Sequence, residues 1–562
     1  MSALGTRDSD LAGGRRWLPD RWLLAALATA GLVALPIATI VFRAAEPAQN
    51  IWSHLIETIL PTYMGNTLWL VLGVGAGTVC LGASTAWLVT MYRFPGRAIF
   101  TWALLLPLAV PSYILAFVIT DQLEYAGTVQ VTLRALFGWS SPRDYWFPEI
   151  RSIGAATAVL TLVLYPYVYL LSRAAFVEQC VELFEVSRTL GSGPLRTFFC
   201  VALPMARPAI AVGTALALME TLNEYGTVSF FAVPTIAAGI FDVWLNMDNP
   251  AGAAQMALLL VVIALLLVYM ERAARHRSRY YATTRQVRAL PQTRLPRSGA
   301  WLATAWCLLP IVLGFVLPAS VLCAYAIDFY TVTLAKDYVS LALNSLYLAG
   351  WAALGTTVIG VVLAYGVRLS QHKAMRGAAE LATIGYAIPG AVLAVGIMFP
   401  LGTIDNTLDR WSQVLFDYPL GLLLSGTGAA LVVGYCARFS AIGYRTIDAG
   451  LSKVTPSMEG AARTLGAGPG RTLWQVHLPL IKPSVVAAAL LVFVDTMKEL
   501  PLTLILRPFN FETLATFVFQ YASEELLEEC ALGALTIVGA GIVPVILISR
   551  TLSRARPGHL HA

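Results

Sequence analysis

Two pairs of acidic side chains lie in stretches of sequence that are otherwise apolar. Glu220 and Glu224 form the first pair, and Asp495 and Glu499 form the second. The members of each pair are four residues apart, so in a helix they share one face. Carboxylate oxygens are the ligands that hard, highly charged cations prefer. The four acids are therefore candidate transient metal ligands that could relay a cation along a central axis.

The same acids also have a structural interpretation. Ionisable groups in apolar segments are costly, and they usually face a cavity or a partner. They could pair with Lys498, Arg507 or backbone donors and hold a gate shut. Lys498 occupies the position that Asn223 has in the first pair, so the two copies differ in charge. Both interpretations assign Glu220, Glu224, Asp495, Glu499 and Lys498 to a translocation pathway or its gate, and the sequence leaves the choice open.

The elements that must position these acids are membrane spans. The chain has 562 residues, of which 57% are hydrophobic and 12% charged, and its mean hydropathy is +0.70. A soluble domain carries about twice that charged fraction. A span needs roughly 20 mostly apolar residues, and about twelve stretches qualify. They lie near 22–43, 66–91, 99–120, 152–172, 207–226, 254–270, 301–326, 341–367, 378–400, 420–437, 484–506 and 531–549.

Arginine and lysine residues gather in short segments beside alternate spans. Such segments precede the first span and follow the second, eighth and last, and another runs from Arg272 to Arg297. All of them fall on one side if the spans alternate, so the positive-inside rule predicts that both termini are cytoplasmic. The segment 22–43 is too long for the apolar region of a typical signal peptide, and we expect a retained span. No aromatic platform accompanies the basic residues, so nucleic acid is not an expected partner.

The second half of the chain repeats the first. RTLGSGPLRTFFCVALP, which begins at Arg188, returns as RTLGAGPGRTLWQVHLP, which begins at Arg463, a shift of about 275 residues. The same shift aligns the first acid pair with the second. Copies of six spans insert in the same orientation, and such parallel repeats enclose a shared pathway. We therefore expect a first repeat over 1–271, a basic cytoplasmic linker over 272–300 and a second repeat over 301–562.

The repeated segment follows the fourth span of each copy and reads as helix, sharp turn, helix. Gly191 and Gly466 end the first helix, because glycine takes the left-handed conformation easily. Pro194 and Pro469 begin the second helix, since proline suits the first helical position. The second helix closes with Leu-Pro before the next span. Its apolar surface should be buried, either against the protein's own spans or against a separate cytoplasmic subunit. In the second case the doubling implies a pair of partners.

This segment resembles the EAA loop of permease subunits in binding-protein-dependent ABC importers, which supplies the coupling helix that seats in the ATP-binding subunit. The first copy has Val186-Ser187 where two alanines are usual. In the second copy the glutamate lies one position earlier relative to the glycine, with Gly460 in the usual glutamate place. The resemblance implies that the coupling residues are Glu185, Gly191, Pro194, Leu203, Pro204, Glu459, Gly466, Pro469, Leu478 and Pro479.

The resemblance covers nearly the whole chain and implies an all-α fold like that of type I ABC importer permeases, with about twelve transmembrane helices as two parallel six-helix repeats. METLNEYGTVSFFAVPT from Met219 and DTMKELPLTLILRPFNFETLATFVFQYASEE from Asp495 resemble permeases of ferric iron (Fe3+) importers. The implied function is translocation of ferric iron delivered by a periplasmic binding protein, across the bilayer of the bacterial inner membrane. A thiamine permease is the alternative among fused relatives.

The chain has no Gly-Lys dipeptide and therefore no P-loop. We expect a transport channel subunit, not an enzyme, with no cofactor bound by this chain. ATP and Mg would lie on two copies of an ATP-binding cassette subunit. An ion-gradient-driven secondary transporter would also fit twelve spans, but the repeated coupling-type loop favours the importer. A membrane-embedded enzyme is disfavoured, because the six histidines lie far apart in sequence.

Overall fold

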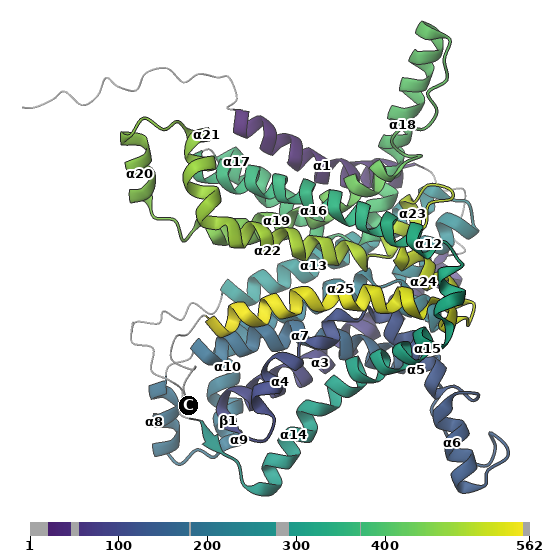
Figure 1. Ribbon diagram of the computed structural model, residues 1–562, viewed down its shortest axis with the longest axis vertical. Helices are drawn as coiled ribbons and strands as arrows, with labels where there is room; N and C mark the ends of the chain where they lie inside the picture. The colour runs from purple at the N-terminus through teal and green to yellow at the C-terminus, as the bar shows by residue number, and fades with distance from the viewer. Residues whose placement is uncertain (1–20, 47–54, 179–180, 277–291, 371–372, 555–562) are drawn as a thin grey trace, which may run out of the picture.

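The computed structural model is an assembly of helices that run roughly side by side (Figure 1). It describes residues 21–46, 55–178, 181–276, 292–370 and 373–554. Within these ranges ten helices are long and apolar enough to cross a membrane, or eleven if the pair Arg97–Ala109 and Ser112–Phe137, bent by 92°, is one span. Helices satisfy every backbone group internally, which lipid requires. The predicted all-α polytopic architecture is confirmed.

The first half contains α1 (Arg21–Ala44), η1 (Leu55–Ile59), α3 (Leu60–Met91), β1 (Tyr92–Arg93), α4 (Arg97–Ala103), η2 (Leu106–Ala109), α5 (Ser112–Leu123), α6 (Thr128–Phe137), α7 (Ile153–Glu178), α8 (Val181–Thr189), α9 (Pro194–Thr197), η3 (Phe198–Ala202), α10 (Leu203–Asn223), α11 (Gly226–Phe230), α12 (Ile236–Phe241), η4 (Asp242–Asn246) and α13 (Pro250–His276).

The second half contains β2 (Thr293–Arg294), α14 (Arg297–Ile311), η5 (Val312–Val316), α15 (Leu317–Leu334), α16 (Tyr338–Leu369), α17 (Lys373–Ile384), η6 (Gly385–Ala387), α18 (Gly390–Phe416), α19 (Gly428–Leu451), α20 (Pro456–Thr464), α21 (Pro469–Thr472), η7 (Leu473–His477), α22 (Leu478–Met497), α23 (Pro501–Leu506), α24 (Leu514–Ser523) and α25 (Leu527–Arg554).

The duplication is visible in the packing. In the first half α3 lies against α7 and α10, and in the second half α16 lies against α19 and α22. Helix α19 takes the place of α7, although it carries Arg438 and Arg445 and is not among the ten apolar helices. In each half a proline precedes a new helix at a matching position: Pro111 precedes α5 and Pro389 precedes α18. The residue before each proline is extended, as its ring demands.

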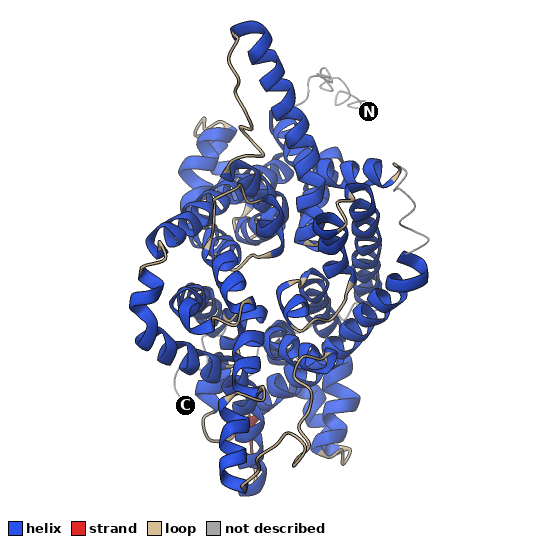
Figure 2. Cartoon of the chain, turned by 90° about the vertical axis from the view of Figure 1, so that its right-hand side faces the viewer, coloured by secondary structure: helices blue, strands red, loops and turns tan. Residues whose placement is uncertain are grey.

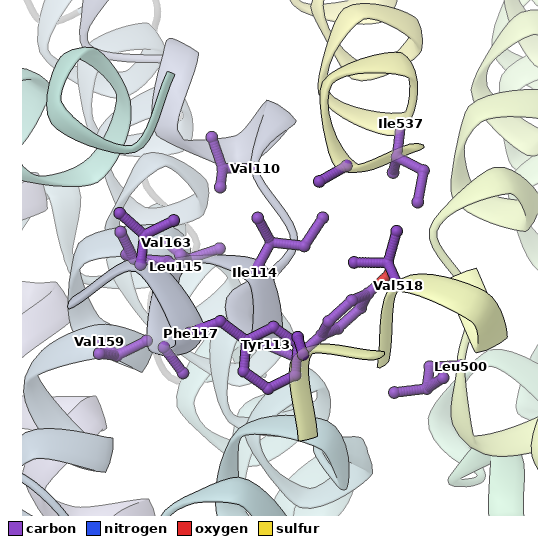
Figure 3. Close-up of a cluster of buried hydrophobic side chains, with 14 of the residues drawn as sticks. Val110, Tyr113, Ile114, Leu115, Phe117, Val159, Val163, Leu500, Val518 and Ile537 are labelled. Carbon is purple, nitrogen blue, oxygen red and sulfur yellow. The ribbon is translucent and has the colours of Figure 1, made fainter. Parts of the chain in front are cut away.

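The halves are interlocked through two mixed cores. In one, Tyr113 and Phe117 of α5 lie among Leu500, Val518 and Ile537 of the second half (Figure 3). In the other, side chains of α12 and α13 lie among those of α18 and α19. Helices α5 and α18 thus each pack into the opposite repeat. Lipid tails are as apolar as these side chains, so close van der Waals fit, not transfer from water, holds the halves together.

The first helix of each repeat also crosses over. Helix α1 lies against α17 and α18 of the second half, and α14 with η5 lies against α3, α4, η2 and α7 of the first. The residues of the linker that the structure describes include β2, which pairs in parallel with β1. Most of the predicted linker 272–300 lies outside the described residues. The repeats are therefore sequence units that fold into one body.

The molecule has two distinct ends. Helices α8, α9, α20 and α21 lie at one of them, which we call the loop end (Figure 1). The described start of α1 and end of α25 also lie there. At the opposite end α6 and the far part of α18 project beyond the bundle, at the bottom and top of Figure 2.

A close helix crossing in the second half predicts a stability effect. A Cβ at Gly360 of α16 would lie 2.6 Å from the carbonyl carbon of Gly443 in α19, whereas a Cβ at Gly350 would meet nothing within 4 Å. We expect Gly360→Ala to separate the two helices and to destabilise the purified chain by about 1–3 kcal/mol. Thermal unfolding in detergent measures this. Gly350→Ala is the matched control, and equal unfolding temperatures for the two variants would contradict the packing described.

Candidate translocation gate and hairpins

Each acid pair sits where a long helix breaks. Helix α10 ends at Asn223 and α11 begins at Gly226, and α22 ends at Met497 before α23 begins at Pro501. The break exposes backbone N–H groups at the start of each short helix, and these need acceptors. The second acid of each pair supplies them. The Glu224 carboxylate accepts a hydrogen bond from the backbone N–H of Thr227 at 2.8 Å.

Glu499 does the same in the second half, where its carboxylate accepts from the N–H groups of Leu502 and Thr503, both at 3.1 Å. The Thr503 hydroxyl also donates to it at 3.0 Å. Carboxylates at helix starts are stabilised by the free N–H groups and the helix dipole. Glu224 and Glu499 therefore cap α11 and α23. This matches the predicted pairing with backbone donors for two of the four acids.

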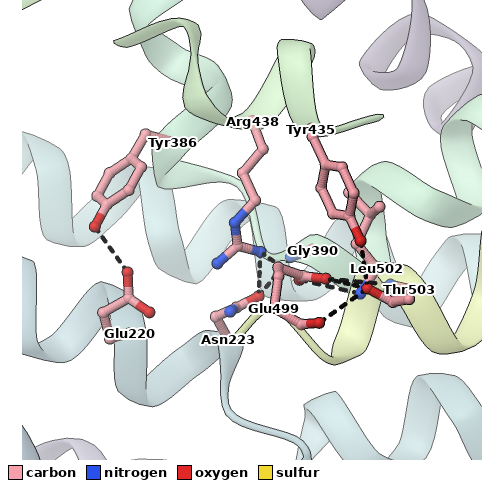
Figure 4. A network of polar contacts seen from close by, with 9 residues as sticks. All are labelled: Glu220, Asn223, Tyr386, Gly390, Tyr435, Arg438, Glu499, Leu502 and Thr503. Carbon is pink, nitrogen blue, oxygen red and sulfur yellow. Dashed lines mark hydrogen bonds and ion pairs between the residues drawn. The ribbon is translucent and has the colours of Figure 1, made fainter. Parts of the chain in front are cut away.

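An arginine joins the halves at the same level (Figure 4). One guanidinium nitrogen of Arg438 in α19 donates to Asn223 Oδ1 at 2.8 Å and lies 3.4 Å from Glu499 Oε1. The Asn223 oxygen also accepts from the N–H of Gly390. The side chains of Arg438 and Glu499 are only 5% and 3% exposed. A buried charge must be paired, so this contact fixes α10 against α18, α19 and α22.

We call these groups the outer layer: Asn223, Glu224, Arg438 and Glu499. Sequence reasoning missed Arg438. The predicted tenth span stopped one residue short of it, and about the same shift that aligns the acid pairs places Val163 at the matching position of the first repeat. A comparison of the repeats therefore could not reveal it. An arginine next to an apolar stretch was the available signal.

The first acid of each pair lies one helical turn nearer the loop end. The Tyr386 hydroxyl donates to Glu220 Oε1 at 2.8 Å, across the halves (Figure 4). Lys498 Nζ lies 2.9 Å from Asp495 Oδ1, and both of these side chains are about a quarter exposed. We call Glu220, Asp495, Lys498, Tyr386 and the neighbouring Tyr167 the inner layer. The inner layer is thus more exposed than the Arg438–Glu499 pair of the outer layer.

A cavity of about 540 Å³ adjoins the inner layer. It is lined by residues of both halves, and Tyr269, Glu271 and Arg445 extend it toward the loop end. Only a cavity of about 90 Å³ lies among the residues of the two layers. The larger cavity therefore lies on the loop side of the inner layer, and only the smaller one reaches the residues of the outer layer.

The remaining predicted partners and roles fall as follows. Arg507 pairs with Glu512 and not with any of the four acids. Pro111 lies at the 92° bend between Arg97–Ala109 and Ser112–Phe137, as expected of a kink. Pro389 directly precedes α18, and its role as a kink stays a prediction. No group of three or more His, Cys, Asp or Glu side chains within the described ranges is arranged to hold a metal ion. The role of the four acids as transient metal ligands therefore stays a prediction.

The two repeated segments form the predicted helical hairpins. Gly191 and Gly466 have φ angles of +76° and +79°, the left-handed conformation expected at the turn. Pro194 and Pro469 begin the second helices after Gly193 and Gly468. The prediction that the second helix closes with Leu-Pro is wrong. Residues Pro194–Asn223 and Pro469–Met497 are each continuous helix, because a π-turn just before each Leu-Pro accommodates the proline ring.

The hairpins are anchored to the bundle by different chemistry. In the first, the Trp87 ring packs against Phe176, Phe184 and Phe198, with centroids 5.4, 5.9 and 5.3 Å away. Glu185 of that hairpin is exposed. In the second, Glu459 pairs with Arg368 and lies 3.1 Å from His477 Nε2. The Tyr365 hydroxyl donates to the carbonyl of Pro469 at 2.7 Å.

Part of each hairpin remains uncovered. Leu190 and Leu195 are 78% and 75% exposed, and Leu465 and Trp474 are 85% and 73% exposed. The protein's own spans thus bury only one face of each hairpin. These apolar side chains project from both hairpins beyond the loop end. Burial against a separate subunit, the second alternative above, would cover them.

Loss of an acid from the outer layer should destabilise the chain more than loss of an acid from the inner layer. Glu499→Gln should leave the buried Arg438 without its counter-charge and destabilise the chain by about 3–5 kcal/mol. Glu220→Gln removes a charge whose partner, Tyr386, is neutral, so its effect should be much smaller. Thermal unfolding of the two purified variants measures the difference. Equal losses would show that the Arg438–Glu499 contact is not the stabilising element.

Comparison with known proteins identifies the family. Residues 78–280 and again 356–555 match the family described as "Binding-protein-dependent transport system inner membrane component". The chain is 26% identical to the Fe(3+)-transport system permease protein FbpB 2 of Haemophilus influenzae, over 95% of this chain and 98% of that protein. It is 29% identical to the molybdenum transport system permease protein ModB of Escherichia coli, over 33% of this chain and 80% of that protein. The chain belongs to the family of binding-protein-dependent transport permeases and carries two copies of its membrane component.

Proposed function

We propose that this chain is the membrane pathway of a bacterial ABC importer for ferric iron. The observation that carries the proposal is the inner layer. Glu220 of one half and Asp495 of the other line the same cavity of about 90 Å³, which we call the neck of the pathway. Carboxylates from both halves give the neck a negative field that attracts a cation, and oxygen ligands suit a hard trivalent ion. Relatives that align along most of the chain are named as ferric iron permeases, which supports the same substrate.

The energy for transport comes from partner subunits in this proposal. The two uncovered hairpins each receive one copy of an ATP-binding cassette subunit, which carries ATP and Mg. The loop end then faces the cytoplasm, and both termini lie there, in agreement with the basic residues near the ends of the spans. A periplasmic binding protein delivers the ion at the opposite end, beside the projecting α6 and α18.

Reconstitution tests the proposal directly. Vesicles that contain this chain, the ATP-binding subunit and the binding protein should accumulate labelled ferric iron only when ATP is supplied. The same vesicles without either partner should show background uptake. Thiamine uptake in place of iron uptake would overturn the substrate, and robust uptake by the chain alone without ATP would support a gradient-driven carrier.

The two hairpins should respond differently to loss of their glutamates. Glu459→Gln removes the charge that pairs with Arg368, so we expect the second hairpin to loosen and the ratio of iron transported to ATP hydrolysed to fall severalfold. Glu185→Gln is the matched control, because Glu185 is exposed. Gly466→Val is the positive control, since a β-branched residue is strained at a φ of +79°. Equal coupling in the two glutamine variants would contradict the difference in anchoring.

A further inference from the structure

Two tyrosines complete the neck of the pathway. Tyr167 of α7 and Tyr386 of η6 come from opposite halves, and both line the large cavity as well as the small one. The Tyr386 hydroxyl donates to Glu220 at 2.8 Å. Glu220 and Asp495 line the small cavity as well. Four oxygen-bearing side chains thus border one cavity of about 90 Å³.

The carboxylates of the inner layer have fewer hydrogen-bond partners than those of the outer layer. Glu224 and Glu499 have their acceptor positions taken by backbone N–H groups and hydroxyls. Glu220 is held by one hydroxyl, and the salt bridge of Asp495 is to an ammonium at 2.9 Å. A phenol and an ammonium are both displaceable by a metal ion, whereas helix caps are not displaced without unfolding the helix start. The acids free to take a ligand are therefore the inner ones.

The charges and the donor types select the ligand. Glu220 and Asp495 carry two negative charges against the single positive charge of Lys498. Hard cations prefer anionic oxygen ligands. A phenol becomes such a ligand only when the cation is strong enough to displace its proton, which a trivalent ion does far better than Mg²⁺ or Ca²⁺. Each phenol that binds releases its proton to water in the cavity.

We propose that Tyr167, Tyr386, Glu220 and Asp495 form a transit site for a hard trivalent cation, with Lys498 as the resident positive charge that the cation displaces. The proposal rests on the proposed function, since the cargo there is ferric iron. Lys498 allows the site to release the cation. When the ion moves on into the large cavity, the ammonium returns to Asp495 and again offsets one of the two negative charges.

The repeat explains why the tyrosines carry no duplicated signal. With the shifts that align the two halves, Tyr386 matches Leu108 and Tyr167 matches Ile442. Both of these apolar side chains also line the large cavity. Each half therefore contributes one phenol at a position where the other half has an aliphatic side chain, and the site forms only when the halves come together.

Spectroscopy on the purified full-length chain tests the site without transport. Ferric nitrilotriacetate should produce a visible phenolate-to-iron charge-transfer band, and the gallium complex should bind without colour. The Tyr167→Phe, Tyr386→Phe double variant should lose the band. Tyr435→Phe is the matched control, because Tyr435 is buried and bonded to Thr503 away from both cavities. Loss of a ligand should weaken iron binding at least about tenfold, as loss of an indirect partner already does.

A variant that binds iron more tightly cannot be explained by misfolding. Lys498→Met removes the competing ammonium and should tighten iron binding severalfold while the band remains. A band that persists in the double phenylalanine variant, or weaker binding in Lys498→Met, would overturn the site. Absence of a band in the wild-type chain, together with normal ATP-driven iron uptake, would overturn the site and leave the proposed function standing. Absence of iron uptake in the complete wild-type assembly would overturn both.

Discussion

The contact of Arg438 with Asn223 and Glu499 is the interaction on which the proposed closure of the pathway depends. It is buried, it carries charge, and it joins the two halves. In a low-dielectric interior neither Arg438 nor Glu499 can lose its partner cheaply. The breaks in α10 and α22 bring these groups together, and the caps formed by Glu224 and Glu499 keep the breaks in place. The helix breaks, the caps and the salt bridge are thus one connected arrangement at this level.

The duplicated chain uses its two copies for different purposes. Lys498 and Arg438, the positive charges of the two layers, both come from the second half. The second hairpin is held by an ion pair and the first by aromatic rings. A pathway made of two identical subunits would place each of these features twice. Fusion of the repeats allows a single cation to face the acids of both halves, so the neck holds a net negative charge without excess repulsion.

Sequence patterns predicted the parts of the molecule that either repeat or have a strong period. The apolar stretches predicted the membrane spans, and the repeated segment predicted the hairpins. Gly191 and Gly466 predicted where the hairpins turn. The acid pairs were found because both copies contain them. Arg438, Tyr167 and Tyr386 were missed because each occurs in only one copy. The exchange of α1 and α14 between halves could not be predicted, because an apolar helix carries no information on which half it contacts. The continuous helix after each hairpin depends on a π-turn, which has no sequence signature of its own.

The central claim is that the pathway in this conformation is closed by the outer layer and open toward the loop end. Side-specific labelling tests it most directly. Ala387 lines the large cavity, so Ala387→Cys, in a background without the native cysteines, should react with a membrane-impermeant thiol reagent when ATP is absent. Leu465→Cys marks the loop end and Thr132→Cys marks the opposite end, since both positions are exposed. The account predicts that Ala387→Cys reacts only from the side that labels Leu465→Cys. Labelling from the side of Thr132→Cys would contradict it.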